Sequence, residues 1–320
     1  MVEGARKLAG VAESGTVVTG GPDEPEVVAF GLEGGEIHVR APDSTVGSEI
    51  ASLFPDYRRE EPDTAACRDR IEVEVGEGGY RIRRPGRGIS RPGSFGAGVA
   101  SGDRSLGGPP RIAADLVEML TISEGIVARG LLEAASHRVH LHAAGARVGD
   151  GAVLALGTRG AGKSSLALAW SVLGLPVLGD DVVFVDDDGR ARPFRRLFKV
   201  DPGRLESHGI DPDSTPAWAE GSEEAWFDPR MAGGWSDGPV PVRAVVVLER
   251  GEGFTGSARL TPLGAAEALN DLLASVVWTG RSGEASLDPL LRLLDGCKAY
   301  RLSFASSARA AREVIELMKG

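Results

Sequence analysis

The feature that most constrains this chain is a glycine-rich segment between two apolar runs. Residues 157–164 read GTRGAGKS and match the phosphate-binding loop pattern G-x-x-x-x-G-K-[ST] at every fixed position. The preceding run, AVLAL at 152–156, predicts a strand, and SLALAW at 165–170 predicts the start of a helix. In this order, backbone N–H groups and the positive end of the helix dipole point at a bound anion. The segment therefore predicts a nucleotide phosphate site.

Each residue type in this loop has a physical role. Glycines allow positive φ values and a close approach of backbone to phosphate. Lys163 is expected to reach the β- and γ-phosphates, and Ser164 is expected to bind Mg²⁺. Because 45 of the 320 residues are glycine, an ordinary strand-to-helix turn is the alternative interpretation. The predicted nucleotide-binding residues are Gly157, Thr158, Arg159, Gly160, Ala161, Gly162, Lys163, Ser164 and Ser165.

Two neighbouring acids, Asp180 and Asp181, interrupt an apolar run over 177–185. Burying two unpartnered carboxylates costs on the order of several kcal/mol, so a cation is expected beside them. Mg²⁺ bridging nucleotide phosphates would satisfy both acids, one positioning the metal and the other accepting a proton from an attacking hydroxyl. The alternative is that both acids cap a turn. By contrast, residues 186–189 (DDDG) predict a simple hairpin turn.

Composition limits the classes of protein to which the chain can belong. A net charge of −10 argues against a general nucleic-acid binder, which needs a basic surface. No apolar run approaches a membrane span, and the N-terminal residues lack the apolar core of a signal peptide. Cys67 and Cys297 are far apart and in no metal-ligand spacing, so both are expected to be reduced. We therefore expect a soluble, cytoplasmic protein with no membrane or nucleic-acid partner.

Residues 1–82 predict a smaller β-rich domain. A helix is expected over 44–54, with Ser44 as its N-cap. His38 alternates with apolar neighbours, which predicts a solvated side chain on a strand. The expected strands, separated by Gly, Pro and Asp clusters, are 16–19, 26–30, 36–40, 70–75 and 80–83, of which the last two form a hairpin.

Residues 83–110 differ from both flanks, because Gly, Pro, Ser and Arg dominate and apolar periodicity is missing. A linker or long loop is the favoured interpretation, and a basic flap that holds the nucleotide or an anionic substrate is the alternative. From 111 to 136, apolar residues recur at helical spacing. Strand and helix patterns then alternate, which predicts an α/β nucleotide-binding domain over 111–320.

Several other residues are candidates for the site. Alternation in the run VHLH places His140 and His142 on one face of a strand, and a turn at 149–151 suggests that this strand pairs with the one before the loop. A zinc site is disfavoured because no third ligand is evident. A basic cluster is either solvated or supplies charge to a transferring phosphoryl group. Its members are Arg192, Arg195, Arg196 and Lys199, and Arg230, in the irregular segment 203–240, is a weaker candidate.

Together, His142, the loop GTRGAGKS and the pair Asp180-Asp181 resemble the C-terminal catalytic domain of HPr kinase/phosphorylase. They are still more similar to the shorter HPr-kinase-like proteins of bacterial peptide-biosynthesis clusters, some of which phosphorylate a serine of a precursor peptide. The resemblance implies a PEP-carboxykinase-like P-loop fold. It implies that Lys163 and the loop hold phosphates, Ser164 and Asp181 support Mg²⁺, Asp180 is the acid/base, and His142 borders the reacting phosphate.

The chain departs from that family at two places. Ser165 stands where those kinases usually have Glu, and the glycine-rich signature RGLGIINV has no counterpart at 192–200. HPr as substrate and the reverse phosphorolysis are therefore not carried over. The expected function is an ATP- and Mg²⁺-dependent kinase acting on a hydroxyl, with Ser or Thr of a peptide or protein as the expected acceptor. A small-molecule kinase and a non-catalytic nucleotide-binding or NTPase switch are the alternatives, and the donor (ATP, GTP or pyrophosphate) and homo-oligomerisation are left open.

Overall fold

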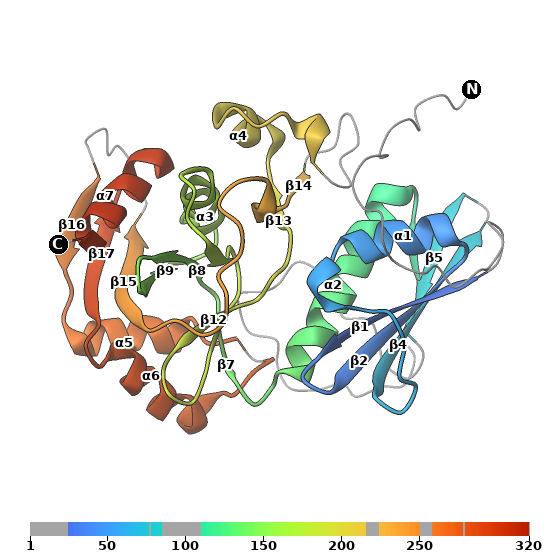
Figure 1. The fold of residues 1–320 in the computed structure, drawn as a ribbon, viewed down its shortest axis with the longest axis horizontal. Coiled ribbons are helices and arrows are strands. Elements are labelled where there is room, and N and C mark those ends of the chain that lie inside the picture. The colour runs from blue at the N-terminus through green and yellow to red at the C-terminus, as the bar shows by residue number, and fades with distance from the viewer. Residues whose placement is uncertain are drawn as a thin grey trace.

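The computed structural model describes residues 25–76, 78–84, 110–215, 224–249, 258–277 and 279–319. Within them the chain has a mixed α/β structure dominated by two six-stranded sheets (Figure 1). The expected strand 16–19 and almost all of the segment 83–110 lie outside the described residues, so the linker and flap interpretations remain predictions.

The first sheet has the order β3-β1-β2-β4-β5-β6. Its strands β2 and β4 are parallel, and all other neighbours are antiparallel. The expected strands 26–30 and 36–40 and the hairpin of 70–75 with 80–83 are confirmed. The strands are β1 (Glu26–Leu32), β2 (Gly35–Ala41), β3 (Arg58–Arg59), β4 (Cys67–Gly76), β5 (Gly79–Arg83) and β6 (Arg111–Ala113), and helices α1 (Ser44–Ser52) and α2 (Leu116–Ala134) pack against the sheet.

Two sequence predictions for this region were wrong. Asp43, and not Ser44, is the N-cap of α1, because its carboxylate accepts a hydrogen bond from the Val46 N–H at 2.8 Å. His38 is buried rather than solvated, with only 3% of its surface exposed. Its Nε2 lies 2.9 Å from the carboxylate of Glu36, two residues earlier on the same face of β2. The alternation of β2 is therefore real, but its polar face is covered.

The helical pattern expected from Arg111 begins only at Leu116, because 111–113 form strand β6 and pair with β5. Asp115 caps the helix that follows by accepting from the Glu118 N–H at 2.8 Å. Helix α2 packs against strands β1, β2, β4, β5 and β6 and against helix α1. The predicted division of the chain at residue 111 stays a prediction, although these contacts tie 111–134 to the sheet formed by the preceding residues.

The second sheet has the order β10-β8-β9-β15-β17-β16, with β9, β15 and β17 parallel. Helices α3 and α7 lie on one face and α5 and α6 on the other (Figure 1). Its strands are β8 (Ala144–Val148), β9 (Gly151–Leu156), β10 (Val177–Gly179), β15 (Val242–Glu249), β16 (Arg259–Pro262) and β17 (Lys298–Ser303), and its helices are α3 (Lys163–Val172), α5 (Ala265–Ala274), α6 (Leu287–Leu294) and α7 (Ser307–Lys319).

Strand β9 explains why the run before the loop is apolar at every position. Val153 and Ala155 pack in the core under α3 and α7. Ala152, Leu154 and Leu156 pack in the opposite core under α5 and α6. A central parallel strand buried on both faces needs apolar residues throughout. This burial fixes where the chain leaves the sheet and enters the loop.

The chain on either side of the loop strand differs from the prediction. The run 139–148 is not one strand: β7 (Val139–Leu141) pairs with β11 (Val183–Val185), whereas β8 pairs with β9. His142 therefore lies between the two strands and not on the strand that pairs with β9. The run 177–185 is likewise broken into β10 and β11. The break places Asp180 and Asp181 outside regular hydrogen bonding, next to His142.

The remaining elements are short. The turn predicted at 186–189 is confirmed, because it joins β11 to β12 (Ala191–Pro193) in an antiparallel pair. A two-stranded sheet is formed by β13 (Phe198–Val200) and β14 (Ala225–Phe227), and helix α4 (Pro202–Ser207) follows β13. None of the helices in the described ranges is both long and apolar enough to cross a membrane.

The first sheet and the later segments share one core. Phe184, Phe194 and Trp226 pack in the same apolar cluster as residues of α1, α2 and the first sheet. The backbone N–H of Arg195 donates to the hydroxyl of Tyr57 at 2.9 Å. These contacts bring α2 close to the segment that follows the two acids.

Candidate phosphate-binding and catalytic site

The loop predicted to bind phosphate connects β9 to α3, as the sequence indicates. Gly160 and Gly162 have φ values of +82° and +104°, which glycine adopts without a steric penalty. Gly162 occupies the N-cap position of α3, and no side chain caps the helix there. The N-terminal end of α3 thus opens directly onto the loop, where its dipole favours an anion.

The predicted nucleotide-binding residues are brought together in this one turn. Thr158, Arg159 and Gly160 are exposed at its tip, and Ala161 and Lys163 are buried beneath it. Gly157, Gly162, Ser164 and Ser165 are half-buried. The exposed tip and the half-buried hydroxyls leave polar groups accessible to a ligand.

Lys163 is the first residue of α3, and its side chain folds back over the loop. Its Nζ donates to the carbonyl oxygens of Gly157 at 2.7 Å and Thr158 at 3.2 Å. Burial lowers the pKa of this amine, while the charges of Asp181 and Asp180 act in the opposite direction. The ammonium therefore lies between the loop and the two acids.

Asp180 is almost fully buried, with 5% of its surface exposed. Burial raises the pKa of its carboxyl group to about 6, although Arg196 and a hydrogen bond with the Ser164 side chain favour the carboxylate. The negative charge of Asp181 also raises this pKa. A carboxyl group tuned toward neutrality beside the loop serine has the properties of an acid/base.

The pKa of Asp181 is shifted in the opposite direction from that of Asp180. Burial opposes its ionisation, but a hydrogen bond from His142 and the charge of Arg196 hold the pKa of Asp181 well below its ordinary value. The distance from His142 Nε2 to Asp181 Oδ1 is 3.0 Å, and each side chain is about one-fifth exposed. The ionised form of Asp181 is thus favoured, and this is the form that binds a metal.

Arg196 is the central cation of the site. Its guanidinium lies 3.3 Å from Asp181, 3.9 Å from Asp180 and 3.6 Å from Glu124 of α2. Lys199 also reaches Glu124, at 2.8 Å. Positive charge is therefore present beside the two acids within the protein itself, supplied by Arg196 and Lys163. Sequence reasoning left Arg196 undecided and missed Glu124 entirely.

The other members of the basic cluster do not reach the two acids. Arg192 pairs with Asp186, and Arg195 pairs with Asp56, each at 3.1 Å or less. Arg230 pairs with Asp228, two residues earlier. Each of these three arginines forms an ion pair with another acid, and a contact with the transferring phosphoryl group stays a prediction for them.

His140 is a structural residue. It is fully buried, and its ring nitrogens lie 3.0 Å from the Thr279 hydroxyl and from the Ala135 carbonyl oxygen. Burial lowers the pKa of His140 to about 4, so the ring is neutral at physiological pH. Its neighbour His142, two residues on, is the histidine that reaches the acids.

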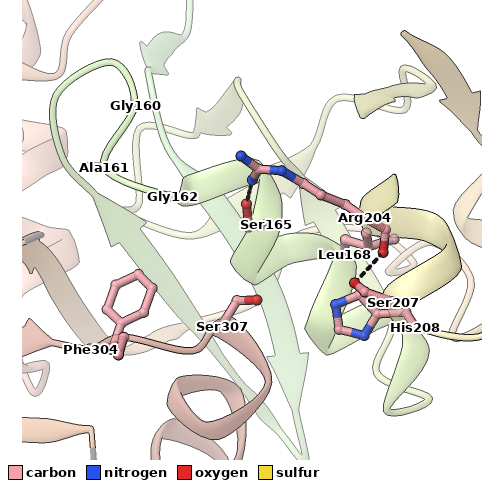
Figure 2. Close-up of a pocket in the computed structure, with 11 residues that line it drawn as sticks. Gly160, Ala161, Gly162, Ser165, Leu168, Arg204, Ser207, His208, Phe304 and Ser307 are labelled. Atoms are coloured by element: carbon pink, nitrogen blue, oxygen red, sulfur yellow. Dashed lines mark hydrogen bonds between the residues drawn. The ribbon is translucent and has the colours of Figure 1, made fainter. Parts of the chain in front are cut away.

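A cavity of about 210 Å³ lies on the other side of the loop, between α3, α4 and the start of α7. Figure 2 shows Phe304 and His208 on opposite sides of it, with Ser307 from α7 near its floor. Arg204 of α4 reaches across to the Ser165 hydroxyl and donates a hydrogen bond to it. No sequence pattern predicts this cavity, because its walls come from three separate segments of the chain.

The oxygen atoms beside the loop suit Mg²⁺, which shares its ligands with phosphate and water, better than a metal bound by protein side chains alone. The described residues contain no group of three or more His, Cys, Asp and Glu side chains suited to hold a metal. Mg²⁺ needs only one or two carboxylates when phosphate oxygens and water complete its octahedron. Asp181, Asp180 and the Ser164 hydroxyl offer such oxygens beside the loop.

Comparison with known proteins gives a likeness in structure over part of the chain. No protein family and no curated protein matches the sequence. Among solved structures, the HPr(Ser) kinase/phosphatase from Coxiella burnetii matches with a TM-score of 0.29 and 14% sequence identity. The match covers 56% of this chain and 93% of that chain. It is a similarity in part of the chain and assigns no family.

Proposed function

We propose that this protein is an ATP- and Mg²⁺-dependent kinase that transfers the γ-phosphoryl group to a hydroxyl, that of Ser or Thr in a peptide or protein. The proposal includes a P-loop nucleotide-binding unit of the PEP-carboxykinase-like type. The observation that carries it is the position of Asp180. This buried carboxyl group, with its pKa raised to about 6, hydrogen bonds to Ser164 at the end of a phosphate-binding loop.

Each residue of the site would have a separate role in the proposed phosphoryl transfer. The loop N–H groups and Lys163 would bind the β- and γ-phosphates and orient the γ-phosphorus toward Asp180. As the acceptor oxygen attacks, Asp180 would take its proton, a P–O bond to the acceptor would form, and the bond from phosphorus to the β–γ bridging oxygen would break. ADP leaves with that electron pair. Arg196 and Lys163 would neutralise charge that develops on the phosphoryl oxygens.

Mg²⁺, when bound, neutralises phosphate charge and fixes the geometry of the triphosphate. Ser164 and Asp181 are the residues proposed to hold it. His142 would keep Asp181 ionised and oriented through their hydrogen bond, 3.0 Å long. The histidine would thereby border the reacting phosphate without exchanging a proton with it.

Calorimetric titration tests the nucleotide site. ATP is titrated into the native protein with and without Mg²⁺, and into Lys163→Ala. Micromolar binding that requires Mg²⁺ and is lost in Lys163→Ala is expected. Lys319→Ala is the matched control, because Lys319 is exposed and pairs with Glu316 on the same helix. If the folded native protein binds no nucleotide, the kinase proposal is wrong.

Transfer is then tested with a library of Ser- and Thr-containing peptides and ATP labelled at the γ-phosphate. A labelled peptide is the expected result. Release of ADP and inorganic phosphate with no labelled peptide, protein or small-molecule acceptor would instead indicate an NTPase switch.

A further inference from the structure

We propose that the cavity between α3, α4 and α7 receives the base and ribose of the phosphoryl donor, so that the donor is a nucleoside triphosphate and not an inorganic polyphosphate. This inference rests on the proposed function, because it assumes that phosphates bind in the loop. It adds the orientation of the donor and a set of residues that select it.

The loop has two chemically different sides. Lys163 and Ser164 face the two acids, where the proposed transfer takes place. Ser165, the next residue, faces the opposite way, into the cavity, where Arg204 contacts its hydroxyl (Figure 2). Successive residues of one helical turn point about 100° apart, which produces this division. A phosphate chain with its γ end at Asp180 would therefore direct its other end toward the cavity.

The size of the cavity suits part of a ligand. Sites that enclose a whole drug-sized molecule measure roughly 300–1,000 Å³. At about 210 Å³, this cavity would hold a base and part of a ribose, with the phosphates outside on the loop. Inorganic pyrophosphate or tripolyphosphate has no group that would fill it.

Arg204 is placed to meet the phosphate nearest the ribose. Its guanidinium lies at the Ser165 hydroxyl, on the boundary between loop and cavity. Among the described residues it forms no ion pair with a carboxylate, unlike Arg192, Arg195, Arg196 and Arg230. An arginine without an acidic partner at the mouth of a cavity favours an anionic ligand, and its planar guanidinium matches phosphate oxygens.

The walls of the cavity suit an aromatic ring with polar edges. Phe304 follows β17 and is 8% exposed, and its ring approaches Gly162 so closely that a Cβ there would lie 3.1 Å from Cζ. The opposite wall carries His208, half-buried at the end of α4. Ser307 adds a hydroxyl that both donates and accepts hydrogen bonds. A base would pack against the Phe304 ring and meet polar groups at its edges.

The test compares two ligands that share phosphates but differ in the base. Mg²⁺-ATP and Mg²⁺-tripolyphosphate are titrated calorimetrically into the native protein, Phe304→Leu and Ala305→Trp. Ala305 lines the cavity and is exposed, so a Trp there would obstruct the cavity without emptying the core. Ala266→Trp is the matched control, because it adds the same bulk at an exposed position on α5 that does not line the cavity. Ala305→Trp also keeps the proposal testable if Phe304→Leu does not fold.

The native protein is expected to bind ATP about tenfold more tightly than tripolyphosphate, or better. Both variants should lose most of that difference and keep their affinity for tripolyphosphate, and Ala266→Trp should behave as the native protein. Equal affinity of the native protein for the two ligands, or variants that bind ATP normally, would overturn the base site and leave the phosphate site standing. Binding of neither ligand would instead overturn the proposed function, and the base site with it.

Discussion

Asp180 and Asp181 are adjacent in the chain, yet the structure moves their pKa values in opposite directions. Burial raises the pKa of Asp180 to about 6. Asp181 is also buried, but His142 and Arg196 outweigh that effect and lower its pKa. Two carboxyl groups whose pKa values are driven apart are suited to two roles, a proton acceptor and a fixed charge.

The first prediction concerns activity as a function of pH. Because Asp180 must be ionised to accept a proton, the rate of phosphoryl transfer should fall as the pH is lowered through about 6. Asp180→Asn should bind ATP normally and transfer no phosphoryl group. A pH–rate profile and ATP titration of both proteins measure this, with the exposed turn residue variant Asp188→Asn as control. Normal transfer by Asp180→Asn would remove Asp180 from the acid/base role.

The second prediction concerns stability and follows from the same pKa. Between its ordinary value of 3.8 and about 6, Asp180 holds its proton in the native state but loses it in the unfolded chain. Native protein then binds more protons than unfolded protein, so Asp180 lowers the free energy of unfolding as the pH rises through this window.

Asp180→Asn lacks this dependence. Its free energy of unfolding, relative to the native protein, should increase between pH 4 and 6, on the order of 2 kcal/mol, and stay constant above pH 7. Denaturant unfolding at a series of pH values measures the difference. A difference that does not change with pH would show that the pKa of the Asp180 carboxyl group is not raised in the native state.

The local motif could be predicted from sequence, and the partners of its acids could not. Strand β9, the loop and α3 are contiguous, so one window of sequence contains the whole turn that is predicted to bind phosphate. Arg196 reaches the two acids from another segment of the chain, and Glu124 of α2 pairs with Arg196. Glu124 belongs to a helix whose periodicity gives no reason to bury a charge, and only the packing of α2 beside the segment after β12 does so.

His38 shows that sequence alternation predicts the face of a strand but not its burial. Alternation correctly placed it opposite Ile37 and Val39, and solvation was inferred because polar strand faces usually meet water. The inference failed because Glu36 hydrogen bonds to it and Arg59 lies 3.9 Å from the same carboxylate. Periodicity indicates which residues share a face of a strand, and tertiary contacts decide whether that face is exposed to solvent.

The third prediction concerns His142. Removing its hydrogen bond in His142→Ala should raise the pKa of Asp181, because that bond is the largest of the contributions that lower it. The variant should need more Mg²⁺ for half-maximal transfer and should lose stability at a higher pH than the native protein on acidification. His142→Gln, which can still donate to Asp181, should be closer to native. A fully active His142→Ala with native Mg²⁺ dependence would make this histidine purely structural.

The fourth prediction concerns the buried ion-pair network around Arg196. Arg196→Met leaves Glu124, Asp180 and Asp181 without their shared cation, and should lower the free energy of unfolding by about 3–5 kcal/mol. Glu124→Gln alone should also destabilise the protein, because Arg196 and Lys199 lose a common partner.

The two substitutions together should cost less than the sum of their separate effects, because Glu124→Gln removes one of the charges that Arg196→Met strands. Denaturant unfolding of the four proteins of this double-mutant cycle measures the coupling. Lys319→Met combined with Glu316→Gln is the control, since that pair is exposed on α7 and should show coupling below about 1 kcal/mol. Additive effects of Arg196→Met and Glu124→Gln would mean that α2 does not hold Arg196 at the two acids.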